Sequence, residues 1–150
     1  MGEPLAESDV VQALALAGEL RVVLSKLSRR LREQAHAADL TGSQKSVLLR
    51  LERDGPATVT ALARAEGVRP QSMGATVSGL EAMGHVTGSP DPSDGRQTIL
   101  CITAACREFI RAAREAKEDW LFRALRAKLA PREQEQLASA LELLKRLADA

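Results

Sequence analysis

The sequence predicts a mainly α-helical fold with one small β-hairpin. Apolar residues repeat at alternating spacings of three and four at both ends of the chain, which is typical of long helices. Glycine and proline divide the middle of the chain into short segments. One β-type run, Gln97–Thr103, follows a loop that is rich in proline and aspartate. Because 150 residues suit one domain, we expect residues 1–150 to form a single one.

The first element is a long helix over roughly residues 8–37. Its apolar residues form a heptad seam that consists of Val10, Ala13, Ala17, Leu20, Leu24, Leu27 and Leu31. Such a seam packs against another helix. The partner helix could belong to the same chain or to a second copy.

Three short helices follow in the middle of the chain. The first begins at a Thr41 or Ser43 cap and stops at Gly55–Pro56. The second begins at Thr58 and ends at Gly67, and the third runs from Pro70 to Gly84. The apolar residues expected to be buried in them are Val47, Leu48, Leu51, Val59, Leu62, Ala63, Met73, Val77 and Leu80.

A strand, a loop and a second strand come next. Val86–Gly88 and Gln97–Thr103 are the expected strands, and the loop between them contains Pro90 and Pro92. Two short helices joined by a tight turn predict a helix-turn-helix. A hairpin directly after it predicts a winged helix-turn-helix over about residues 41–103.

Two further helices close the chain, within about residues 104–149. One runs from about Ala104 to Leu129, and Pro131 opens the other, whose first turn is acidic. Its apolar seam consists of Leu137, Ala140 or Leu141, Leu144 and Leu147. Together with residues 8–37, this region is expected to form dimerisation helices; an intramolecular bundle is the alternative.

The third short helix has an outer face unlike that of an ordinary solvated helix. Around its axis, Gln71, Ala75, Ser78, Gly79 and Ala82 lie opposite the apolar side, and Ser72 and Thr76 flank them. This face is small, neutral and rich in hydrogen-bonding groups, so it suits the major groove of DNA. A cramped core helix with small neighbours is the alternative.

The loop of the hairpin carries one cation, Arg96, two residues after Asp94. An arginine on a wing can enter the minor groove, whose negative potential attracts it. We expect Asp94 to hold the guanidinium through a charge-assisted hydrogen bond. The alternative is an ordinary surface turn with an incidental ion pair.

These segments together resemble the MarR family of bacterial transcriptional regulators. The matching segments are "LTGSQKSVLLRL" (40–51), "TVTALARAEGVRPQSMGATVSGLEAMGHV" (58–86), "DPSDGRQTILCIT" (91–103) and "LAPREQEQL" (129–137). The resemblance implies a homodimer joined through its terminal helices. It also implies binding to a pseudo-palindromic DNA operator, usually as a repressor that a small-molecule effector or oxidation releases.

The resemblance also assigns candidate DNA-binding residues. Gln71, Ser72 and Thr76 fall in the recognition helix, and Asp94 and Arg96 match the wing pair. The DNA backbone is the expected partner of four further residues at helix starts, namely Arg69, Ser43, Thr58 and Thr60. The chain departs from the family pattern at Thr87 and Gly88, where many members carry an arginine before the wing.

Composition excludes several other classes of function. The net charge of +1 gives no support for DNA binding. A prediction of DNA binding must therefore depend on geometry. No catalytic or phosphate-loop motif is present, and no spacing of His and Cys suggests a metal site. We therefore expect no enzyme activity, cofactor or metal. The absence of a signal peptide or an apolar run of membrane-spanning length predicts a cytoplasmic protein.

Two alternatives to an effector-controlled regulator stay open. One is a winged helix that binds another protein and not DNA. The other is a thiol-based redox regulator that uses Cys101 or Cys106, since Cys106 falls in the first turn of a helix, where the dipole lowers a thiol pKa. Inert buried thiols are the expected state of both residues. The ligand-binding residues of an effector site are not identified by the sequence.

Overall fold

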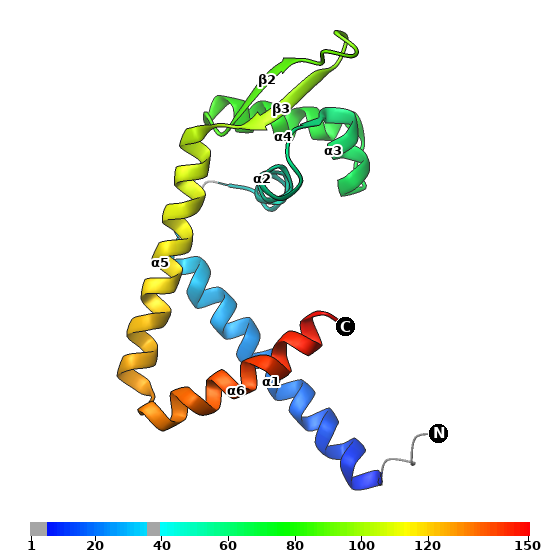
Figure 1. Cartoon of the computed structure of the whole chain (residues 1–150). Coiled ribbons are helices and arrows are strands. Elements are labelled where there is room, and N and C mark those ends of the chain that lie inside the picture. The colour runs from blue at the N-terminus through cyan, green and yellow to red at the C-terminus, as the bar shows by residue number, and fades with distance from the viewer. Residues whose placement is uncertain (1–5, 36–39) are drawn as a thin grey trace. The chain divides into compact units, whose positions relative to one another are not determined.

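The computed structural model describes residues 6–35 and 40–150, which divide into two compact units (Figure 1). The central unit comprises residues 37–114, and the terminal unit combines residues up to 36 with residues from 115 onward.

The fold class expected from the sequence is confirmed: six helices and a small sheet are found among the described residues. The helices are α1 (Glu7–Gln34), α2 (Gly42–Asp54), α3 (Val59–Glu66), α4 (Pro70–Ala82), α5 (Ala104–Lys128) and α6 (Pro131–Ala148). The strands are β1 (Ala57–Thr58), β2 (Val86–Pro90) and β3 (Thr98–Ile102). None of the helices in the described ranges is both long and apolar enough to cross a membrane.

The structure differs from the expectation at the end of the first helix and in the sheet. The first helix ends at Gln34 and not near residue 37, because the backbone of Ala35 is already extended; residues 36 and 37 lie outside the described ranges. The strand β1 was not predicted. It has only two residues, and it exists because Ala57 and Thr58 pair antiparallel with Leu100 and Ile99 of β3.

Side-chain caps set where the short helices begin. Thr41, not Ser43, caps α2 in a capping box: its Oγ1 accepts from the Gln44 backbone N–H at 3.1 Å, and Gln44 Oε1 accepts from the Thr41 N–H at 3.0 Å. Thr58 caps α3 through its Oγ1 alone, which accepts from the Ala61 backbone N–H at 3.1 Å. Gly67 ends α3 with a φ of 68°, a conformation that favours glycine.

The core of the central unit is aliphatic and lies where α2, α3, α4 and the sheet meet. Strand β3 is the middle strand, antiparallel to both β1 and β2. The buried residues are Val47, Leu48, Leu51, Leu62, Ala63, Met73, Val77, Leu80, Val86, Leu100, Ile102 and Cys106. The residues expected to be buried in the short helices are confirmed, except that Val59 is only partly buried.

The helical geometry predicted Gly79 on the outer face of α4, but in the structure Gly79 faces Gln44 of α2. A Cβ atom at this position would lie 2.6 Å from Nε2 of Gln44. The side chain of Gln44 is already engaged in the cap of α2, so a larger residue at position 79 would push it away. Gly79 is therefore a packing position between α2 and α4.

The helices α1 and α6 of the terminal unit contain no buried residue among those described. Their exposed large apolar residues are Val10, Val11, Leu14, Leu16, Val22, Val23, Leu24, Leu27, Leu137, Leu141, Leu143 and Leu147. Within the unit, the Arg30 guanidinium packs over the Trp120 ring, 5.7 Å from the centre of the ring. The apolar seams of both helices are thus largely exposed in the single chain, although Leu20, Leu31 and Leu144 are partly covered.

Leu80 provides a test of the core. Its side chain is completely buried, so Leu80→Ala is expected to lower the free energy of unfolding by about 2–5 kcal/mol, because it removes apolar contacts and leaves a cavity. Urea denaturation measures this loss. Leu49→Ala is the matched control, since Leu49 is 43% exposed in α2 and its loss should cost less than about 1 kcal/mol. Equal losses for the two variants would show that Leu80 does not belong to the core.

Candidate nucleic-acid interface

The exposed face of α4 is polar but almost free of charge. Gln71, Ser72, Ala75, Ser78 and Ala82 are exposed, because Met73, Val77 and Leu80 turn the opposite face into the core. Glu81 is the one charged residue within Pro70–Ala82. Thr76 is half-buried, and its hydroxyl donates to the Ser72 carbonyl oxygen at 3.2 Å, so its oxygen still has a lone pair to accept a bond.

Arg69 occupies the N-cap position of α4. It is exposed and has an extended backbone, and Pro70 follows as the first helical residue. The first N–H groups of a helix lack intrahelical partners and carry a partial positive charge. Arg69 therefore adds a full charge to a helix end that already favours anions.

The hairpin loop between β2 and β3 is held by its own side chains. The Asp91 carboxylate accepts from the Ser93 backbone N–H at 2.9 Å and from the Ser93 hydroxyl at 2.7 Å. These bonds hold the pKa of the Asp91 carboxyl below its usual value. The Asp91 N–H donates to the Gln97 carbonyl at 2.9 Å, which closes the loop.

Asp94 holds the backbone of Arg96 and not its guanidinium, in contrast to our expectation. Oδ1 of Asp94 accepts from the Arg96 backbone N–H at 3.1 Å, and the ion pairs found among the described residues do not include one between these side chains. An aspartate in a turn reaches the N–H two residues later more easily than a long side chain. The Arg96 side chain is exposed.

Three of the predicted residues come together around an open hollow of about 250 Å³ between the loop end of β3 and the start of α3. Thr58 and Thr60, from the start of α3, line it together with Arg96. Val59, Gln97 and Thr98 complete the lining. Ser43 does not line this hollow; it lies exposed in the first turn of α2. The hollow combines hydroxyl groups with a cation, which suits a phosphate group.

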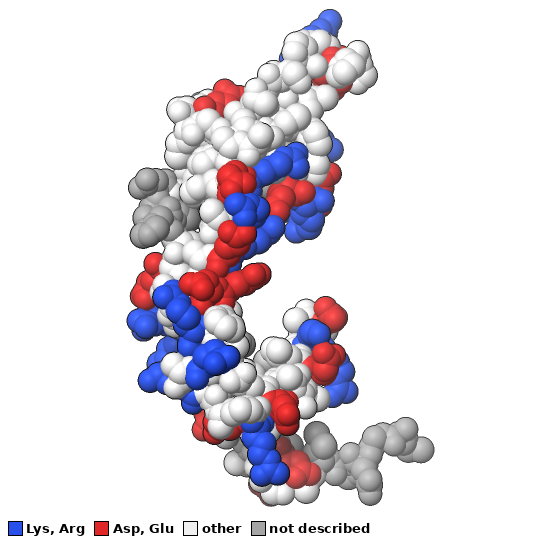
Figure 2. All heavy atoms as spheres, turned by 60° about the vertical axis from the view of Figure 1, so that its left-hand side comes forward, with Lys and Arg blue, Asp and Glu red and all other residues white. Residues whose placement is uncertain are grey.

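The central unit has few cations with which to attract DNA. Within residues 41–103, which the structure describes in full, Lys45, Arg64, Arg69 and Arg96 form no ion pair, whereas Arg50 and Arg53 do. In Figure 2 the wing at the top of the view is largely white, with red and blue atoms close to its tip. Shape and hydrogen bonding, more than bulk charge, therefore distinguish this surface.

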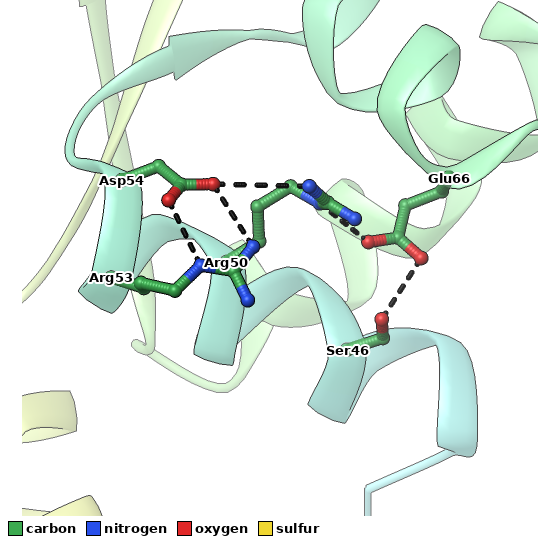
Figure 3. A network of polar contacts seen from close by, with 5 residues as sticks. All are labelled: Ser46, Arg50, Arg53, Asp54 and Glu66. Carbon is green, nitrogen blue, oxygen red and sulfur yellow. Dashed lines mark hydrogen bonds and ion pairs between the residues drawn. The ribbon is translucent and has the colours of Figure 1, made fainter. Parts of the chain in front are cut away.

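A network of polar contacts joins α2 to the last residue of α3 (Figure 3). Oε2 of Glu66 accepts from the Ser46 hydroxyl at 2.9 Å, and Oε1 accepts from Arg50 Nε at 2.7 Å. Arg50 also pairs with Asp54 at 3.8 Å, and Asp54 pairs with Arg53. Because α3 leads into the turn before α4, this network helps to place the helix-turn-helix. Sequence reasoning missed it; only the Arg50–Asp54 spacing of four was visible there.

The cysteines give no support to a redox site. Cys106 is buried, as expected, and burial raises the pKa of its thiol, which is the opposite of the lowering that the redox alternative requires. Its backbone N–H donates to the Thr103 hydroxyl, which caps the start of α5. Cys101 is partly buried on β3. The described residues include no cluster of three or more His, Cys, Asp and Glu that could hold a metal ion.

The helix-turn-helix, the wing and the outward face of α4 define a winged helix-turn-helix protein. A family model described as "MarR family" matches residues 38–97. An uncharacterised HTH-type transcriptional regulator from Mycobacterium bovis is 38% identical over 134 residues, which cover 89% of this chain and 93% of that protein. The chain thus belongs to the MarR family of transcriptional regulators.

Solved structures agree with this assignment. A putative transcriptional regulator from Pseudomonas aeruginosa is 34% identical, with a TM-score of 0.73 over 93% of this chain and 96% of that one. A variant of MepR from S. aureus, bound to an oligodeoxyribonucleotide, has a TM-score of 0.70 over 88% of this chain and 97% of its own. At 20% identity, that second likeness shows the fold alone.

Glu66 provides a test of the polar network. Hydrogen bonds from Arg50 and Ser46 hold the pKa of the Glu66 carboxyl below its usual value. A lowered pKa in the folded state stabilises the fold above the ordinary glutamate pKa of about 4.3, and this stabilisation is lost as the pH falls through the folded-state value. We expect Glu66→Gln to lower stability at pH 7 and to weaken the loss of stability between about pH 5 and pH 3.

Thermal unfolding at a series of pH values measures both effects. Glu81→Gln is the control, since Glu81 is exposed on α4 and forms none of the ion pairs found among the described residues. A Glu66→Gln profile that coincides with that of the wild type at every pH would show that the network contributes nothing to stability.

Proposed function

We propose that this regulator binds double-stranded DNA sequence-specifically, as a homodimer on a pseudo-palindromic operator. The observation that carries the proposal is the exposed neutral face of α4, together with the exposed cations Arg69 at its N-cap and Arg96 on the wing. An ordinary solvated helix face would carry lysine and glutamate. A face of small hydrogen-bonding residues lets a helix approach base edges closely.

Each candidate residue has a role that its chemistry supports. The Gln71 amide can pair with the N6 and N7 positions of adenine, and Ala75 can contact a thymine methyl group. Ser72 and Thr76 can bond to phosphate oxygens. Because Pro70–Ala82 contains no arginine or lysine, the arginine–guanine pair is not available to α4. We therefore expect the major-groove half-site to favour A·T pairs.

The remaining candidates would hold the DNA backbone and the minor groove. Arg69 faces phosphates at the start of α4, and Thr58, Thr60 and Ser43 offer hydroxyls at the starts of α3 and α2. Arg96, whose backbone Asp94 holds, would enter the minor groove beside the wing.

The largely exposed seams of α1 and α6 support the homodimer. An amphipathic helix without a covered apolar face does not gain the burial that stabilises helices in proteins. A second copy would cover these residues, and it would repeat the winged region so that the two half-sites lie about 34–36 Å apart.

Repression and release by a small-molecule effector complete the proposal. Both rest on the family resemblance. The proposed cytoplasmic location rests on it too, because the chromosome of a bacterium lies in the cytoplasm. The DNA-bound MepR variant, which shares the fold, also supports binding to DNA.

The first test is selection of genomic fragments by the purified protein, followed by footprinting. A protected pseudo-palindrome is expected. Arg96→Ala should weaken binding to that duplex at least about fivefold in Kd, because a minor-groove contact is lost in each half-site. Fluorescence anisotropy measures the affinity. Arg132→Ala, which removes an exposed cation of α6, is the matched control and should leave the affinity unchanged.

Failure of the folded dimer to retain any fragment at low salt would refute DNA binding. The winged region would then be a protein-interaction module. Equal affinity of Arg96→Ala and wild type for the protected duplex would refute only the role of the wing arginine.

Leu24 tests the dimer. It is 47% exposed in the seam of α1, so Leu24→Glu is expected to place a charge in the dimer contact and to shift the protein to monomers. Sedimentation velocity gives the mass. Leu49→Glu is the matched control, since Leu49 is similarly exposed but lies in the central unit. A dimer that tolerates Leu24→Glu at micromolar concentration would show that this seam is not the interface.

A further inference from the structure

We infer that the ion pair between Glu52 and Arg114 is a positioning link that fixes the winged helix-turn-helix on α5 and so sets the half-site spacing that the dimer accepts. The inference rests on the proposed function, because its main readout is DNA binding. Neither residue contacts DNA in the proposal, so both are positioning residues.

The geometry of the pair is bidentate. Nη1 of Arg114 lies 2.8 Å from Oε1 of Glu52, and Nη2 donates to Oε2 at 3.0 Å. A pair of parallel bonds fixes the orientation of the two groups as well as their separation. The Glu52 side chain is only 26% exposed, so water screens this pair less than a pair of fully exposed side chains.

Arg114 lies on the face of α5 that attaches this helix to the core of the central unit. Cys106, Ile110 and Arg114 follow one another at spacings of four, so they lie along one face of the helix. Cys106 is buried in the core, and Ile110 packs against it. The ring of Phe109 packs against the ring of His85, with 4.9 Å between the two ring centres. Arg114 extends this attachment by one more turn, at the last residue of the central unit.

On the other side, Glu52 belongs to the helix that the polar network ties to α3. Arg50 binds Glu66 at the end of α3, and Figure 3 shows this contact beside Asp54 and Arg53. Polar links therefore run from α5 through α2 to α3, which leads into the turn before α4. A change at Arg114 would alter how firmly this group of helices is held on α5.

The consequence concerns the distance between the two recognition helices of a dimer. The helix α5 is continuous from Ala104 to Lys128 and carries the chain from the central into the terminal unit. If the first part of α5 is held rigidly, two α4 helices keep one separation and the dimer accepts one operator spacing. A loosened link would allow several spacings at lower affinity for the best one.

The test compares two duplexes with four proteins. The duplexes are the pseudo-palindrome recovered by selection and the same sequence with one base pair inserted at its centre, which moves a half-site by about 3.4 Å. The proteins are wild type, Glu52→Gln, Arg114→Gln and the charge swap Glu52→Lys with Arg114→Glu. Asp119→Asn, which breaks the local pair with Arg123 within α5, is the control.

We expect each single variant to bind the selected duplex about two- to fivefold more weakly, the size of effect measured for partly exposed pairs. The preference for that duplex over the inserted one should fall with it, because only the correctly spaced complex needs the rigid link. The charge swap should restore both quantities at least in part, whereas Asp119→Asn should change neither.

Amide hydrogen exchange of residues 107–114, measured without DNA, tests the link separately. Both single variants are expected to exchange faster than the wild type, and the charge swap is expected to exchange more slowly than either single variant. A spacing preference that stays unchanged in the single variants, or a swap that restores nothing, would overturn the inference while leaving the proposed function intact. If wild type binds neither duplex, the proposed function fails, and the role of the pair in DNA spacing fails with it.

Discussion

The packing of one side of α4 against the rest of the central unit is the constraint on which the surface of this protein depends. Met73, Val77 and Leu80 are buried at spacings of four and three, between α2, α3 and the sheet. Once these three side chains are fixed, the rotation of α4 about its axis is fixed too, because protein cores are close-packed. Gln71, Ser72 and Ala75 must then face outward. The same apolar contacts that stabilise the unit thus select which groups can meet a ligand.

Polar contacts add precision to what the apolar core allows. The capping box of Thr41 and Gln44 fixes where α2 begins, and Gly79 leaves room for the Gln44 side chain against α4. At the far end of α3, Glu66 accepts hydrogen bonds from two residues of α2. Individually these contacts contribute modestly to stability. Together they hold the short helices in one arrangement, as close readout of base edges requires.

Charge has a limited role in this regulator. The chain has a net charge of +1, and both arginines of α2 are engaged in ion pairs. A protein with few free cations releases few counterions from DNA, so salt affects its binding less than it affects that of a strongly basic protein. In the proposed complex, hydrogen bonds and shape would therefore determine specificity.

The sequence by itself determined the six helices, the wing and the family. Heptad spacing, helix caps and the Gly and Pro residues predicted the helices and the wing, because these signals act within a few residues of the chain. The candidate residues Gln71 and Arg96 were likewise identified from local patterns and from the resemblance. Only the tertiary structure decided which distant groups meet. The strand β1 exists through its pairing with β3, Asp94 was found to hold a backbone N–H, and Glu66 and Arg114 found their partners on α2. A sequence pattern does not encode such contacts, because they depend on how separate elements pack.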